Sequence, residues 1–350
     1  MRRIAIGLSA VVAASLSAFS APAAATHIAL LRSPVFRIEG PYRSMQGPQS
    51  QETVKIAPAA EGEIWVVGYE AHVIDPATSA PRSSEYVCHN ALLREAGSPG
   101  QQKGKAEERA LFLVSQGVTK LRFPAGFGMP LAAGENVSYM SQALNHDWDG
   151  RAFDLRFDAK VAYLKADEVQ APLKPLLPVE LLGVVSLEGR PARFADGTKE
   201  NAPGADHGAG CTMGKTVPTA GQIRDASGQK FSAHWVVPPG RQIYRTPIAR
   251  AVLPNAGTSI HYAVAHLHPF AESIALRDVS SGRDVFKLNA RNFKDRVGLQ
   301  EVEHFSSAKG AALSPDHEFE LVSVYNNTSG EEQDAMASMW VYVDRPEGKR

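Results

Sequence analysis

The segment FDLRFDAKVAYL, residues 153–164, alternates apolar and charged side chains with a period of two. Successive side chains on a β-strand point to opposite faces, so this alternation produces one apolar face and one charged face. A strand of this kind is half buried and belongs to an antiparallel sheet that covers a core on one side. The apolar face would carry Phe153, Leu155, Phe157, Val161 and Tyr163, and the charged face Asp154, Arg156, Asp158 and Lys160.

Short segments of similar character recur along the chain, and no long window has a helical period. Turn-forming clusters such as PPGRQ, LPNAGT and YNNTSGEEQD separate them. Many short strands with turns between them are typical of sandwiches and jelly rolls. We therefore expect an all-β fold of two tandem antiparallel jelly-roll (β-sandwich) domains. Further strands are expected in EIWVVGYEAHVI (63–74), HWVVPPG (234–240), SIALRDV (273–279), DVFKLNA (284–290), FELVSVYN (319–326) and SMWVYV (338–343).

The N-terminal residues have the parts of a secretory signal peptide, which predicts a secreted or periplasmic protein. Met-Arg-Arg precedes an apolar run from Ile4 to Ala18, and the small residues that end at Ala25 fit a cleavage site. No other run is long and apolar enough to cross a bilayer. Removal of 25 residues from 350 leaves about 325, a length that suggests two domains. The expected division is a signal peptide at 1–25, an N-terminal domain at 26–170, a proline-rich linker at 171–183 and a C-terminal domain at 184–346.

The charge balance argues against nucleic acid as a partner. Lys plus Arg and Asp plus Glu number 37 each, and no basic tract is present. The two cysteines, Cys88 and Cys211, could form a disulfide in an exported protein or serve as metal ligands.

The stretch HYAVAHLHPF, residues 261–270, holds three histidines in a run that otherwise reads as a buried strand. Residues two apart on a strand lie roughly 6.6 Å apart on one face, so His266 and His268 can converge on one ion. The alternative is two histidines at a strand end that are bonded to carbonyls and water. The shared face would carry Ile260, Tyr262, Val264, His266 and His268.

Met336 lies between an acidic turn and an expected strand near the C-terminus. A thioether together with two imidazoles favours copper, because soft sulfur suits Cu(I). The alternative is that Met336 simply fills the core. Copper is therefore the expected cofactor, as one or two ions.

Several motifs, in their order along the chain, resemble the copper type II, ascorbate-dependent monooxygenases. HLH (266–268) resembles the H-x-H pair of that family, EVEHF (301–305) its V-E-H segment, and QDAMASMWVYV (333–343) its D-E-M segment. In the first half, EYVCHNALL (85–93) resembles a His-His pair followed by apolar residues. GFGMPLAAGENVSYMSQALNH (126–146) resembles the approach to a single ligand histidine.

The resemblance implies two jelly-roll domains that face each other across a solvent-filled gap, each with one copper. The second site would use His266, His268 and Met336, with Met339 as the alternative sulfur, to bind dioxygen and hydroxylate a C–H bond. The first site would pass an electron through His89 and His146. Its remaining family histidine is replaced here by Cys88, which is either a ligand or part of a disulfide with Cys211. His72 and His207 are further candidates to complete this site.

The expected substrate contacts of the family's amidating enzyme are missing. Val264 stands where that enzyme has an arginine, and Ser338 and Trp340 replace an asparagine and a tyrosine. Without the arginine a glycine-extended peptide has no carboxylate anchor, so peptide amidation is not expected. The substrate and the reductant stay open.

Two rival functions remain. One is a non-catalytic copper-binding or interaction protein on the same fold, which the altered first site favours. The other is a zinc hydrolase, which would need a carboxylate near the H-x-H pair; Glu272 is the nearest in sequence. The other histidines, His234, His261 and His317, match no partner pattern and are expected to be structural, and His304 is expected to be structural or to contact a ligand.

Overall fold

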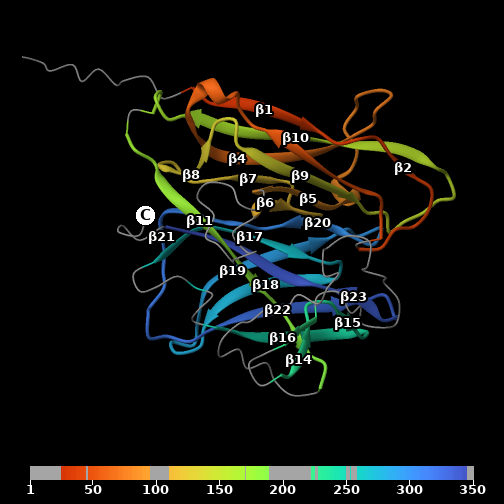
Figure 1. The fold of residues 1–350 in the computed structure, drawn as a ribbon. Helices are drawn as coiled ribbons and strands as arrows, with labels where there is room; N and C mark the ends of the chain where they lie inside the picture. The colour runs from red at the N-terminus through yellow and green to blue at the C-terminus, as the bar shows by residue number, and fades with distance from the viewer. Residues whose placement is uncertain are drawn as a thin grey trace, which may run out of the picture.

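The computed structural model describes residues 25–44, 46–94, 110–169, 171–188, 222–224, 228–249, 253 and 258–344. This part of the chain is all-β, as the alternating segments predict, and its only helical segments are two 3-10 turns, η1 (Ala59–Glu61) and η2 (Ser84–Tyr86). The strands form two β-sandwiches of the jelly-roll type, stacked one above the other in Figure 1. None of the described helical segments is long and apolar enough to span a membrane.

The N-terminal half is a sandwich of two mainly antiparallel sheets. The segment at 153–164 is its longest strand, and its apolar side chains Leu155, Phe157 and Val161 are fully buried. The outer sheet has the order β1 (His27–Arg32), β10 (Phe153–Lys165), β4 (Glu63–Ile74) and β8 (Phe127–Ala132), with β2 (Phe36–Ile38) on β10 and β7 (Lys120–Arg122) on β4. The inner sheet has the order β3 (Gln49–Lys55), β9 (Asn136–Ala143), β5 (Val87–Arg94) and β6 (Ala110–Val114).

The C-terminal half repeats this design. Its inner sheet has the order β11 (Lys174–Leu182), β24 (Ala337–Asp344), β17 (Ser259–Leu267) and β21 (Phe305–Ala312). Its outer sheet has the order β16 (Gly240–Ile248), β22 (Phe319–Asn327), β18 (Ala271–Asp278), β19 (Arg283–Asn292) and β20 (Leu299–Val302). Two small sheets join β12 (Val185–Ser186), β14 (Lys230–Ser232) and β13 (Gln222–Arg224), and β15 (Trp235–Val237) with β23 (Gln333–Ala335).

Most of the segment expected to be a linker is strand β11. It pairs antiparallel with β24 along its length and parallel with β8 at Lys174 and Pro175, so it joins the sheets of the two halves. Proline cannot donate a ladder hydrogen bond, but beyond Pro175 none of the described strands pairs with the second edge of β11, and proline is tolerated at such an edge. Burial of Leu176 and Leu181 outweighs the local proline signal.

A β-bulge at His261 changes the face assignment on β17. Ile260 pairs with Val343 and Tyr262 with Tyr342, so one residue on β17 is extra and the alternation shifts by one. Ile260 therefore does not share a face with His266, whereas Tyr262 and Val264 do.

The two sandwiches contact each other directly through their inner sheets. The Tyr342 hydroxyl of β24 donates to the carbonyl of Leu111 on β6 at 3.2 Å, and the Tyr342 and Phe112 rings lie 6.3 Å apart. The ring of Phe123 lies 5.7 Å from that of Tyr262. The solvent-filled gap that the resemblance implies is here occupied by buried aromatic side chains, and one hydrophobic cluster includes residues of both halves.

Gly117 is a point of close approach between the halves, and its replacement by alanine should be costly. Its φ is 82°, and an added Cβ would lie 3.0 Å from Val302 and 3.1 Å from Leu299. We expect Gly117→Ala to lower the free energy of unfolding by about 3 kcal/mol through backbone strain plus overpacking. Gly126→Ala is the matched control, because its φ is 86° and no atom lies within 4 Å of the added Cβ. Denaturant unfolding of both variants separates the packing contact from the backbone strain that they share. Equal losses in the free energy of unfolding would contradict tight packing at Gly117.

Candidate metal centre

His266 and His268 lie at the end of β17 and point toward the N-terminal half. Each is only 3% exposed, and their rings are 5.3 Å apart and nearly perpendicular. The ring of His89, from β5 of the other half, lies 4.4 Å from that of His266. Histidines that the resemblance assigns to two separate copper sites therefore meet in one buried region between the sandwiches.

Met336 lies between β23 and β24, directly before the residues that pair with the end of β17. Leu267 pairs with Ala337 and His266 with Ser338, so the backbone of Met336 comes close to that of His268. Met339 pairs with Ala265 and therefore points to the opposite face. Of the two sulfur candidates, the register favours Met336.

Tyr325 fixes the backbone on both sides of this pair. Its hydroxyl donates to the carbonyl of Met336 at 2.5 Å and accepts from the backbone N–H of His268 at 3.4 Å. Burial raises the pKa of Tyr325, so the hydroxyl stays protonated and keeps its role as a donor. Met336 and His268 are thus held together by one side chain.

Cys88 and His89 lie side by side, although neighbouring strand residues were expected to face opposite ways. Val87 pairs with Ala143 and His89 with Gln142, so Cys88 is the extra residue of a β-bulge, which re-aims side chains. The Cys88 sulfur lies 3.3 Å from Nδ1 of His89, and Oε1 of Gln142 lies at the same distance from that nitrogen.

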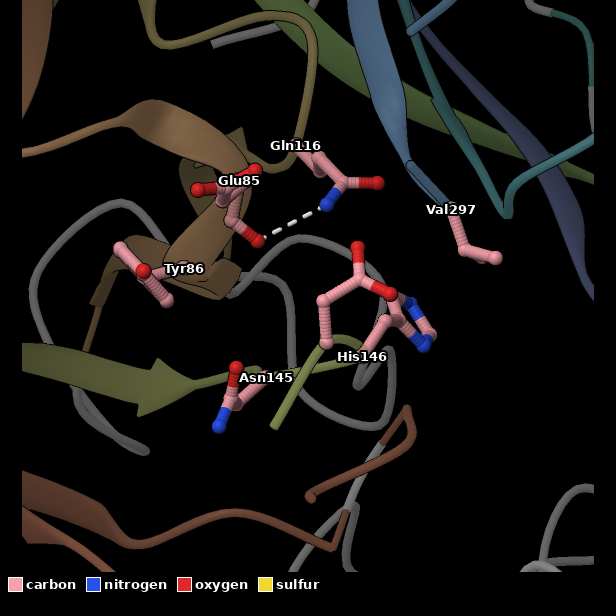
Figure 2. A pocket seen from close by; sticks show the side chains of 7 residues that line it. Glu85, Tyr86, Gln116, Asn145, His146 and Val297 are labelled. Carbon is pink, nitrogen blue, oxygen red and sulfur yellow. Dashed lines mark hydrogen bonds between the residues drawn. The ribbon is translucent and has the colours of Figure 1, made fainter. Parts of the chain in front are cut away.

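His146 follows β9 and lines a small pocket of about 20 Å³ between the halves. Figure 2 shows His146 beside Gln116, whose Nε2 donates to the carbonyl of Glu85 at 2.8 Å, with Val297 of the C-terminal half nearby. Burial, with smaller effects of His268 and Arg43, lowers the pKa of His146 to about 4. This imidazole is therefore neutral at physiological pH, the form in which it can bind a metal. The pocket is lined by Glu85, Tyr86, Gln116, Asn145, His146, Asp147 and Val297.

Two residues beside His268 were not anticipated from the sequence. Asp334 and His234 come from the paired strands β23 and β15 and their flanks, where Val236 pairs with Asp334. Oδ2 of Asp334 lies 2.5 Å from Nδ1 of His268, and Oδ1 lies 3.8 Å from Nδ1 of His234. His234 was expected to be structural, and the expected carboxylate, Glu272, is instead exposed and paired with Arg241 at 2.8 Å. No local motif links His234 to Asp334, because the two are joined only by strand pairing.

Electrostatics keep this carboxylate ionised. Burial alone would raise the pKa of Asp334, but the charge of His268 and the contacts with His234 lower it to about 2. On the other side of the imidazole, Nε2 of His268 lies 3.0 Å from the hydroxyl of Ser44, which is 3.9 Å from the Cys88 sulfur. A polar chain thus crosses the interface from Asp334 to Cys88.

The remaining candidates lie elsewhere. His72 is on the outward face of β4, 3.5 Å from Glu70. His304 stacks on Tyr262 at 5.4 Å. His207 and Cys211, and with them the disulfide expected with Cys88, lie outside the described residues, as does the signal peptide up to residue 24. His261 lies 3.0 Å from the Ser307 carbonyl and His317 2.6 Å from Asp278.

We call the five histidines between the halves, together with Asp334, the histidine cluster: His89, His146, His234, His266, His268 and Asp334. Imidazole suits zinc and copper, carboxylate oxygen is a further zinc ligand, and the Cys88 sulfur beside His89 adds a soft donor. The donor set can therefore hold a transition metal ion.

No family model and no curated protein matches the chain. Among solved structures, the STIV MCP is 12% identical with a TM-score of 0.32 and covers 90% of this chain and 98% of its own. Peptide:N-glycanase F is 9% identical with a TM-score of 0.34 and covers 92% of this chain and 97% of its own. A structure of the Sulfolobus Turreted Icosahedral Virus is 10% identical with a TM-score of 0.30 and covers 92% and 91%. Likenesses at this level carry no argument about function, which is inferred below from the site alone.

Proposed function

We propose that this protein binds copper between the two sandwiches through His266, His268 and Met336, and that it is an oxidoreductase similar to the copper-dependent C–H hydroxylating monooxygenases. The observation that supports the proposal is the buried pair His266 and His268, whose rings lie 5.3 Å apart, with the backbone of Met336 held beside that of His268 by Tyr325. Two imidazoles and a thioether form a soft donor set that suits Cu(I). Copper bound there would supply one-electron redox chemistry and the activation of dioxygen.

The protein's own residues would position this site. Asp334 and Ser44 approach opposite nitrogens of His268 and fix the orientation of its ring. Tyr325 holds the backbone of Met336 against that of His268.

The surroundings of the H-x-H pair do not favour a peptide substrate. Val264, at the position of the family's arginine, pairs with the apolar side chain of Trp340. Neither side chain offers a cation to a carboxylate. We therefore propose a small, uncharged or weakly polar substrate rather than a glycine-extended peptide.

A non-catalytic copper-binding protein is the second candidate, and one contact favours it. The rings of His89 and His266 are 4.4 Å apart, so the two ligand sets are not separated. A single copper held by both halves would have no second site in the same chain to deliver an electron. Copper stoichiometry separates the candidates, because two coppers per chain support the enzyme and one supports the binding protein.

Replacement of the Met336 sulfur tests the copper proposal directly. Met336→Leu keeps the volume but removes the soft donor, and we expect the Cu(I) affinity to fall by at least about tenfold. Met339→Leu is the matched control, because Met339 is buried in the same strand but points to the opposite face. Competition with a chromophoric Cu(I) chelator measures both. Equal affinities of the two variants would remove Met336 from the site.

Export is part of the proposal, on the basis of residues 1–25. An exported protein would meet copper and dioxygen in an oxidising compartment. N-terminal sequencing of the protein recovered outside the cytoplasm should begin at Thr26. An intact Met1 would contradict export.

A further inference from the structure

His234, His268 and Asp334 form a compact group that belongs to the C-terminal half alone. Their ligand atoms all lie within 4.8 Å of one another. His234 is 2% exposed and His268 3%, and the Asp334 side chain is 18% exposed. The three come from the flanks of β15 and β17 and from β23, so strand pairing fixes their positions.

The contact between Asp334 and His268 is close but is not aligned as a hydrogen bond. Oδ2 of Asp334 and Nδ1 of His268 are 2.5 Å apart, yet neither atom has a hydrogen-bond partner among the described residues. His317 and Asp278 form a comparison pair elsewhere in the chain, where a similar distance of 2.6 Å does give a hydrogen bond. Buried polar atoms almost always have a hydrogen-bond partner. Two such atoms that lie close together without a hydrogen bond between them therefore indicate a partner that both of them contact.

A cation is the partner that fits these atoms. A metal ion can accept lone pairs from a carboxylate oxygen and an imidazole nitrogen at the same time. A proton shared between these two atoms would instead require the N–H bond to point at the oxygen.

We propose that His234, His268 and Asp334 bind a divalent cation of the Zn²⁺ type, in a second site that adjoins the copper site. Two imidazoles and one carboxylate are a ligand set of zinc, and the oxygen donor disfavours Cu(I). The two sites share His268, which turns Nδ1 to Asp334 and Nε2 toward Ser44 of the other half. If each ring nitrogen of His268 binds a metal ion, the imidazole must release its remaining N–H proton to solvent. The site has three protein ligands and leaves a position for water.

The test uses the full metal-free chain and Zn²⁺ alone, with Co²⁺ as a spectroscopic substitute. We expect the wild type to bind one Zn²⁺ per chain at this site. Asp334→Asn and His234→Gln should each weaken Zn²⁺ binding by more than the roughly 10–100-fold that loss of an outer contact costs. Both should also remove the Co²⁺ absorption bands of a low-symmetry site. Asp278→Asn is the matched control, because it breaks the comparison pair, and it should leave Zn²⁺ affinity unchanged.

Copper(I) binding separates this proposal from the previous one. If Asp334→Asn and His234→Gln weaken Zn²⁺ binding by a much larger factor than they weaken Cu(I) binding, the second site stands, whatever the outcome for Met336→Leu. The proposal is overturned if both variants keep Zn²⁺ affinity within about threefold, well below the cost of even an outer contact. It is also overturned if they lose Cu(I) and Zn²⁺ equally, because Asp334 would then only orient His268. Circular dichroism confirms folding, and the two variants come from different strands, so a folding defect in one leaves the other to decide.

Discussion

His266→Gln is expected to lose tight copper binding and the stability that copper confers. Saturating Cu(I) should stabilise the wild type by about 4 kcal/mol when free copper is about a thousand times its dissociation constant. Loss of a direct ligand should weaken binding by more than the roughly 10–100-fold that removal of an outer partner costs. Thermal unfolding with and without Cu(I) at a buffered free concentration measures the effect.

His261→Gln is the control for this prediction. His261 lies on the same strand and is 4% exposed, but it contacts the Ser307 carbonyl on β21 and not the histidine cluster. Its copper-dependent stabilisation should match that of the wild type. Loss of the copper effect in both variants, or in neither, would show that copper does not bind through His266.

The metal-free protein is expected to become less stable as the pH falls from about 6.5 to about 4. Burial lowers the pKa of His146 from 6.5 to about 4, so between these values the unfolded chain binds a proton that the folded chain does not. Stability therefore rises with pH in this window, by up to about 3 kcal/mol in total. The lowered pKa of Asp334 extends the loss below its usual 3.8, toward about 2.

Denaturant unfolding at several pH values measures this dependence, and His146→Gln provides the comparison. A neutral amide has no proton to gain, so the slope between pH 6.5 and 4 should flatten. An unchanged slope in the variant would mean that His146 is not buried as neutral imidazole.

Most of the fold can be predicted from local alternation. The segments at 63–74, 153–164, 319–326 and 338–343 all lie within strands, because one buried face and one solvated face leave a period-two record in the sequence. Strand β11 was predicted to be a linker because of its prolines. Proline is compatible with a strand whose second edge pairs with no other described strand, as on β11 beyond Pro175. That information comes from tertiary pairing and not from the segment.

The candidate site was predictable only where its residues are close in sequence. The proximity of His266 and His268 follows from their spacing, and their rings lie 5.3 Å apart. The assignment of Met336 as a ligand stays a prediction. Asp334 and His234 could not be found, because strand pairing joins residues about a hundred positions apart. Bulges at Cys88 and His261 also reverse the local face assignment, and bulges have no clear signature in a single sequence.

The most direct test of a copper centre between the two sandwiches is anomalous diffraction at the copper edge from crystals of the Cu(I)-loaded protein. The account predicts an anomalous peak within bonding distance, roughly 2.0–2.1 Å, of the imidazole nitrogens of His266 and His268, with the Met336 sulfur as a further ligand. A peak at the surface, or none in the histidine cluster, would contradict it.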